Sequence, residues 1–135
     1  MGKACEIAGR DLEENLKQMK RMRDRLHEGL SRELTRMKLN GHPDQRLPNT
    51  LNLSFKGLEA NRILEEIGLE VAASAGAACH SDRVEVSHVL EAMAVPTEWA
   101  KGTVRFSVGR MTTAKEIDRA VRVVADAVKK LSGET

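Results

Sequence analysis

The residues best suited to chemistry are a cysteine and a histidine inside a run of small side chains. Residues 73–82 read Ala-Ser-Ala-Gly-Ala-Ala-Cys-His-Ser-Asp, which places a thiol at Cys79 and an imidazole at His80. Such a segment bends freely, and the positive charge of Arg83 together with backbone N–H groups would lower the pKa of the thiol. Cys79 is therefore a candidate nucleophile, with His80 as a candidate base or hydrogen-bond partner. The alternative is that Cys79 is a small core residue, because unpaired cysteines are usually buried.

A second candidate is an arginine at the end of a predicted strand. Arg110 follows Gly109, directly after the alternating segment 103–108. A guanidinium in that place can hold a carboxylate through two parallel hydrogen bonds. A surface ion pair would explain Arg110 equally well.

Metal and phosphate chemistry is disfavoured by spacing. The chain has two cysteines and four histidines, without a Cys-x-x-Cys or a His-x-x-x-His pair, and structural zinc needs four closely arranged ligands of these types. A glycine-rich phosphate loop of known spacing is also missing. We therefore expect no metal site among His27, His42, His80 and His88.

Length and composition narrow the class of protein. The chain has 135 residues, enough for one core, and its 22 Lys and Arg against 20 Asp and Glu leave a net charge of only +2. Aromatic residues make up 2%, too few for the stacking surfaces of single-strand nucleic-acid readers. An apolar run long enough for a membrane span is absent. Two cysteines in unlike contexts form no disulfide framework, which indicates a reducing, cytoplasmic location.

The elements that must position these residues begin with one long amphipathic helix over residues 4–34. Its apolar positions recur in steps of three and four, and its charged face, which includes Arg23, reads as solvated. About 30 residues give a length of roughly 45 Å, longer than the diameter of a compact chain of this size. We expect the end near Ile7 to overhang and to mediate self-association. Cys5, on this helix, is expected in a core or an interface.

The rest of the chain alternates short strands and helices. Polar–apolar alternation predicts strands, and spacings of three and four predict helices. The last helix begins with a capping box, Thr113 and Glu116. The predicted fold is α+β, a small antiparallel sheet of three or four strands with two long helices packed on one face. Strands are expected at 36–39, 50–55, 69–73 and 103–108, and helices at 57–67, 87–93, 96–100 and 114–131.

Three segments together resemble a known enzyme family. They are Arg-Leu-Pro-Asn-Thr-Leu-Asn-Leu-Ser-Phe at 46–55, the small-residue run at 73–82, and Val-Arg-Phe-Ser-Val-Gly-Arg at 104–110 followed by Thr112-Thr113. In this order and spacing they are similar to the C-terminal part of the cysteine desulfurases and selenocysteine lyases, class-V aminotransferase-like enzymes that depend on pyridoxal phosphate (PLP). The Ala-Ala-Cys-His-Ser-Asp sequence is closer to the selenocysteine lyases and the desulfurases of iron–sulfur cluster assembly than to the branch with Gly-His-His-Cys.

The resemblance implies a role for each candidate residue. Cys79 matches the loop cysteine that attacks the sulfur of cysteine, or the selenium of selenocysteine, and leaves a persulfide and alanine. Arg110 matches the arginine that binds the α-carboxylate of the substrate. The family's fold implies that residues 1–135 form the small C-terminal domain of a fold-type I PLP enzyme, with 4–34 as the helix that leads to a large domain. A sulfur-acceptor protein is implied as a further partner.

The resemblance departs from the family at the cofactor. Its Schiff-base lysine lies in a Ser-x-His-Lys sequence, which is not present here. We therefore expect this chain alone to bind no PLP and to be inactive without a large domain or a complementing subunit. The alternative is a stand-alone sulfur-carrier or regulatory interaction module that accepts a persulfide on Cys79. A nucleic-acid binder built on the basic residues of the first helix is the third and weakest hypothesis.

Overall fold

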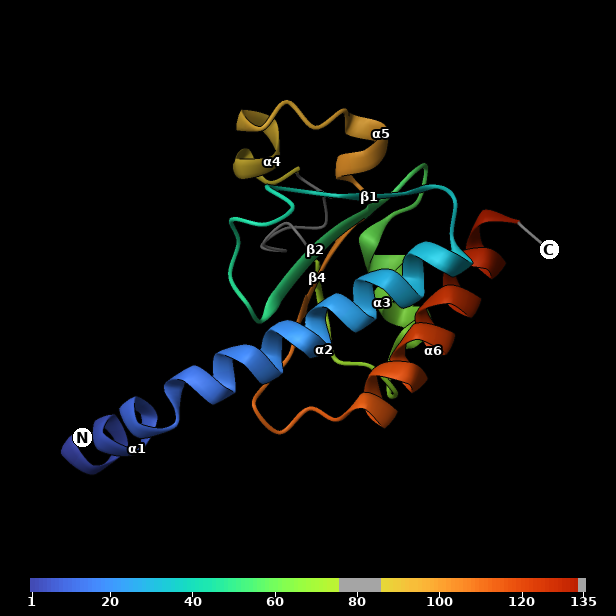
Figure 1. Cartoon of the computed structure of the whole chain (residues 1–135). Helices are drawn as coiled ribbons and strands as arrows, with labels where there is room; N and C mark the ends of the chain where they lie inside the picture. The colour runs from blue at the N-terminus through green and yellow to red at the C-terminus, as the bar shows by residue number, and fades with distance from the viewer. Residues whose placement is uncertain (76–85, 134–135) are drawn as a thin grey trace.

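The computed structural model describes residues 1–75 and 86–133. Most of the helices and strands follow along the chain in the order that the sequence predicts (Figure 1). The elements are α1 (Gly2–Arg10), α2 (Leu12–Glu33), β1 (Met37–Leu39), β2 (Thr50–Phe55), α3 (Ala60–Ile67), β3 (Ser74–Ala75), α4 (His88–Ala92), α5 (Thr97–Ala100), β4 (Thr103–Ser107) and α6 (Ala114–Ser132).

The four strands in the described residues form one antiparallel sheet in the order β1-β2-β4-β3. Helices α2 and α6 run side by side along one face of this sheet, and α3 packs against α6 (Figure 1). The predicted α+β fold, with an antiparallel sheet of three to four strands and two long helices on one face, is confirmed.

The core lies between the sheet and these helices, and strand alternation builds it. Leu53 of β2 stands opposite Val104 of β4, and both are fully buried because successive side chains point to opposite faces. From the helices, Leu30 and Val124 meet this layer. The spacing of three and four along α2 and α6 turns one stripe of each helix inward. Other large side chains buried in this core are Leu26, Leu51, Phe55, Ile63, Ile67 and Phe106.

Helix α6 begins where the sequence predicts. The hydroxyl of Thr113 accepts a hydrogen bond from the backbone N–H of Glu116, and the Glu116 carboxylate accepts one from the backbone N–H of Thr113. This reciprocal pair satisfies donors that the first turn of a helix leaves without partners. It also lowers the pKa of Glu116, chiefly through the backbone hydrogen bond from Thr113. The start of α6 is therefore well defined directly after the turn that carries Arg110.

The long first helix differs from its predicted form in one respect. The structure divides residues 4–34 at Asp11, whose φ of −102° and ψ of 6° lie outside the helical range. The guanidinium of Arg10 binds the Asp11 carboxylate through two hydrogen bonds of 2.6 and 2.7 Å. Helix α1 contributes no buried residue, and it projects away from the sheet (Figure 1). Ile7, Leu12 and Leu16 remain 40%, 52% and 38% exposed along this projecting end.

A predicted strand over residues 69–73 is also wrong. The backbone N–H groups of Glu70 and Val71 both donate to the carbonyl of Ile67, which continues the end of α3 as a turn. Those donors are therefore not available to a neighbouring strand. Pairing with β4 begins only at Ser74, opposite Arg105.

Candidate functional site

Arg110 lies in a tight turn between β4 and α6. The backbone N–H of Gly109 donates to the hydroxyl of Thr112 at 2.9 Å, and the N–H of Thr112 donates to the carbonyl of Gly109 at 3.1 Å. Just before the turn, Val108 donates its N–H to the carbonyl of Asn49 and so extends the pairing with β2. The side chain of Arg110 is exposed. The turn therefore presents a guanidinium at the end of a central strand, as the sequence predicts.

Helix α2 contacts this turn from the side. The side-chain amide of Gln18 donates from Nε2 to the carbonyl oxygen of Thr112 at 3.2 Å. Further toward the N-terminus, the pKa of Asp11 is lowered, mainly by its hydrogen bond with Arg10 and also by the positive charge of Arg110. The first part of α2 thus lies next to the turn that carries Arg110. Sequence reasoning found neither Gln18 nor Asp11, because no local pattern links them to residues almost a hundred positions later.

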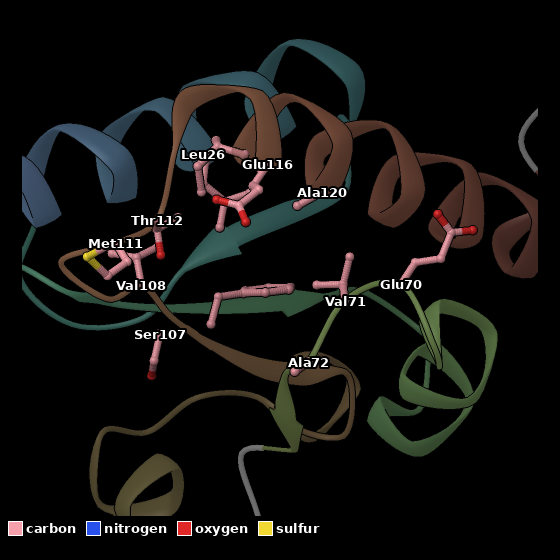
Figure 2. Close-up of a pocket in the computed structure, with 12 residues that line it drawn as sticks. Leu26, Glu70, Val71, Ala72, Ser107, Val108, Met111, Thr112, Glu116 and Ala120 are labelled. Atoms are coloured by element: carbon pink, nitrogen blue, oxygen red, sulfur yellow. The ribbon is translucent and has the colours of Figure 1, made fainter.

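A cavity of about 420 Å³ opens beside the same turn (Figure 2). Its walls are mostly apolar and come from α2, α6, the end of β4 and the segment after α3. Met111, which is 77% exposed, stands at one side, and the carboxylates of Glu70 and Glu116 belong to the lining. The other lining residues are Leu26, Val71, Ala72, Phe106, Ser107, Val108, Thr112, Ile117 and Ala120.

This cavity does not fit PLP. A lysine is needed to anchor the cofactor as a Schiff base, and the lining contains none. The lining also lacks arginine and histidine, whereas its two carboxylates would repel a phosphate group. The described part of the chain likewise contains no cluster of His, Cys, Asp and Glu arranged to hold a metal ion.

Cys79 and His80 lie outside the described residues. Their distances to Arg110 therefore remain untested, and their roles stay predictions. Cys5 is exposed, so its placement in the core is wrong for the chain as it stands, whereas its placement in an interface remains open.

The structure corrects one expectation about the charged face of α2. Arg23 is only 3% exposed, so the prediction of a solvated side chain is wrong at this position. Its Nη1 donates to the carbonyl of Leu47 at 2.7 Å, and its Nε and Nη2 donate to one carboxylate oxygen of Asp24. The segment after β1 contacts this part of α2. The spacing of residues along the helix cannot predict such a contact, because the contact involves a distant part of the chain.

A second arginine shares that carboxylate. Nη2 of Arg46 lies 3.6 Å from Oδ1 of Asp24, and burial together with the charge of Arg23 lowers the pKa of Arg46. Burial lowers the pKa of the neighbouring His27 as well, with a further contribution from Arg46. This cluster joins the segment that contains Arg46 and Leu47 to α2.

None of the helices in residues 1–75 and 86–133 is long and apolar enough to cross a membrane.

Comparisons with known proteins agree with these features. The family described as "Aminotransferase class-V" matches residues 1–120. "Cysteine desulfurase IscS" of Methanosarcina thermophila is 42% identical over 132 residues, which cover 97% of this chain and 32% of that protein. "Cysteine desulfurase NifS" of Azotobacter vinelandii is 41% identical over 134 residues, which cover 97% and 33%.

A solved structure, described as "NIFS-LIKE PROTEIN", matches with a TM-score of 0.80 at 27% identity and covers 96% of this chain and 32% of that one. The chain spans about one third of the length of the relatives it matches. The resemblance to the cysteine desulfurases that the three sequence segments indicate is confirmed. By its fold, and by a family match that covers most of its length, the chain belongs to the class-V aminotransferases.

Proposed function

We propose that this chain supplies the substrate-carboxylate site and the sulfur-accepting cysteine of a PLP-dependent cysteine desulfurase or selenocysteine lyase. In this proposal it acts together with a large domain or a complementing subunit that holds the cofactor. Its position in the cytoplasm, where thiols stay reduced, belongs to the same proposal.

One observation supports the proposal most strongly. An exposed guanidinium, Arg110, stands in a hydrogen-bonded turn at the end of β4, within a chain that is 42% identical over nearly its whole length to a cysteine desulfurase. A guanidinium has two parallel N–H groups that match a carboxylate. The hydrogen-bonded turn and the capped start of α6 fix the backbone around Arg110. The guanidinium therefore extends from a backbone in a defined position.

Each predicted residue then has a distinct role. Arg110 binds the α-carboxylate of cysteine or selenocysteine. The thiolate of Cys79 attacks the sulfur or selenium atom of the substrate, and an S–S or S–Se bond forms as the bond from that atom to the β-carbon breaks. The electron pair of the broken bond passes to the β-carbon, which takes up a proton and gives alanine. His80 removes the proton from the thiol. The residues that line the cavity beside the Arg110 turn do not fit PLP, so we assign the cofactor to the large domain.

Complementation tests this function. The chain, with PLP and cysteine, is assayed for alanine and sulfide alone and together with the remaining two thirds of the Methanosarcina thermophila enzyme. We expect no turnover from the chain alone and turnover from the mixture. Selenocysteine is assayed in parallel to identify the substrate. If the mixture yields no alanine although the two parts bind each other, the proposal is wrong.

Two pairs of variants assign the residues. Cys79→Ala should abolish sulfide release, whereas Cys5→Ala, which removes the exposed cysteine of α1, should retain it. Arg110→Lys should raise KM for cysteine about tenfold or more, because a lysine ammonium cannot form the bidentate pair. Arg32→Lys, at the opposite end of α2, removes the same chemical group from an exposed pair with Glu28 and should change nothing.

The alternative function, a stand-alone sulfur carrier or regulatory module, predicts a different result. In that case the mixture shows no turnover, but the chain takes up a persulfide on Cys79 from an intact cysteine desulfurase. Mass spectrometry of the chain after such an incubation separates the two functions.

A further inference from the structure

Both the nitrogen and the oxygen of the Gln18 side-chain amide make hydrogen bonds. Its Nε2 donates to the carbonyl oxygen of Thr112 at 3.2 Å, and its Oε1 accepts a hydrogen bond from Nη2 of Arg21 at 2.8 Å. Because an arginine can only donate, the amide oxygen must face Arg21. The amide nitrogen is therefore the end that faces the turn.

The hydrogen bond that Gln18 donates connects two parts of the chain that are far apart in sequence. It joins α2 to a backbone atom 94 residues later, two positions after Arg110. The turn itself is closed by the two hydrogen bonds between Gly109 and Thr112. A turn closed in this way moves as one unit, so a tie at Thr112 restricts the backbone of Arg110 as well.

The charge of Arg110 also acts at the start of α2. Asp11 directly precedes this helix and lies seven residues before Gln18 in the chain. The charge of Arg110 contributes to the lowered pKa of Asp11. The turn is therefore bonded to α2 through its backbone at Thr112, and the charge of Arg110 acts on the residue that precedes this helix.

We propose that Gln18 is a positioning residue for Arg110, and that it sets the position from which the guanidinium binds the substrate carboxylate. The inference rests on the proposed function, in which Arg110 binds that carboxylate. Bidentate pairing requires the guanidinium and the carboxylate to be nearly coplanar. A turn that shifts along α2 loses this alignment even when its own hydrogen bonds persist.

A merely structural hydrogen bond makes different predictions. If Gln18 only stabilised the fold, its removal would lower the melting temperature and leave KM unchanged. A positioning role instead raises KM with little change in kcat, because binding of the carboxylate is weakened in the ground state and the transition state alike. It also makes the effect of Gln18 depend on the presence of Arg110.

The first arm of the experiment uses the chain alone. Gln18→Met keeps length and helix propensity but removes the donor. The control, Lys17→Met, changes the residue next to Gln18 and removes an exposed ion pair with Glu13. Amide hydrogen exchange, followed by NMR, should be faster at Gly109 and Thr112 in Gln18→Met and unchanged in Lys17→Met. If amide exchange at Gly109 and Thr112 is the same in the two variants, the inference is wrong, irrespective of the role of Arg110.

The second arm uses the complemented enzyme described above. We expect Gln18→Met to raise KM for cysteine about fivefold, the effect of one hydrogen bond, with kcat nearly constant. In an Arg110→Lys background the same substitution should raise KM no further. Full additivity of the two effects overturns the inference.

The two arms separate the inference from the function on which it rests. If Arg110→Lys leaves KM unchanged, the proposed role of Arg110 is wrong and the inference falls with it. If Arg110→Lys raises KM and Gln18→Met does not, the proposed function stands and only the positioning role is wrong.

Discussion

Gly29 of α2 and Val121 of α6 lie in direct contact where the two long helices cross. A Cβ atom built on Gly29 would be 2.6 Å from Cγ2 of Val121 and 3.4 Å from its Cβ. The missing side chain lets the two helices approach closely. One turn away, Arg25 binds Asp118 through two hydrogen bonds of 2.6 and 2.8 Å. Together these contacts set how α2 lies relative to α6, and thus to the turn before α6.

Gly29→Ala should destabilise the protein. Alanine gains about 1 kcal/mol in helix propensity over glycine, but the contact with a β-branched side chain costs about 1–3 kcal/mol because valine has one preferred rotamer in a helix. We expect a net loss of about 1 kcal/mol in the free energy of unfolding, measured by urea denaturation. The double variant Gly29→Ala with Val121→Ala should recover the loss. A Gly29→Ala variant more stable than wild type would contradict the close contact.

Gly102→Ala should lower the free energy of unfolding far more than Gly29→Ala. A Cβ at this position would lie 2.2 Å from the backbone carbonyl oxygen of Phe55, which cannot rotate away as a side chain can. The same two residues share a hydrogen bond of 3.0 Å from the N–H of Phe55 to the carbonyl of Gly102. We expect a loss of about 3 kcal/mol or more, measured in the same way.

Gly9→Ala is the matched control for both glycine variants. Nothing lies within 4 Å of a Cβ at Gly9, which sits in the projecting helix α1. Its replacement should leave the free energy of unfolding equal or slightly higher.

The projecting end of the first helix should mediate self-association. Ile7, Leu12 and Leu16 are each more than one third exposed on α1 and the start of α2, and apolar surface of this kind gains free energy when a second molecule covers it. Leu12→Glu with Leu16→Glu should weaken the association about tenfold or more in sedimentation equilibrium. Lys17→Glu is the control, because it changes the net charge by the same two units on an exposed side chain of the same helix. A monomeric wild-type chain at millimolar concentration would refute this prediction.

Stability should depend on the protonation of His27. Burial and the charge of Arg46 lower the pKa of His27 in the folded state below its ordinary value. Between the lowered and the ordinary pKa the unfolded chain binds the proton more tightly, so the free energy of unfolding falls as the pH falls. Denaturation at pH 7.5 and 5.5 should therefore show a larger loss for wild type than for His27→Gln. The hydrogen-bonded carboxylates of Glu33, Glu116 and Asp118 have lowered pKa values and lose their contributions only at more acidic pH.

Much of this fold follows from local pattern. Alternation at Leu51, Leu53 and Phe55 is enough to predict a strand with one buried face, and Thr113 with Glu116 is enough to predict the start of α6. The segment 69–73 shows where local pattern is insufficient. It is as apolar as a short strand, but the end of α3 uses its backbone donors first.

The candidate site divides in the same way. Arg110 could be found from sequence because a strand, a glycine and an arginine are neighbours in the chain, and because the surrounding motif resembles one family. Gln18 could not, since its partner is a backbone oxygen that any residue would offer. The burial of Arg23 could not be predicted either, because its carbonyl partner, Leu47, comes from another part of the chain.

The amino-acid sequence by itself thus determined the family and most of the helices and strands, and it indicated candidate site residues, because these depend on spacing along a few turns or strands. Tertiary structure alone decided which charges are buried, how closely α2 approaches α6 at Gly29, and which side chain holds the Arg110 turn. These contacts join residues far apart in the chain, and their energies depend on the distance between surfaces that exists only once the helices have packed on the sheet.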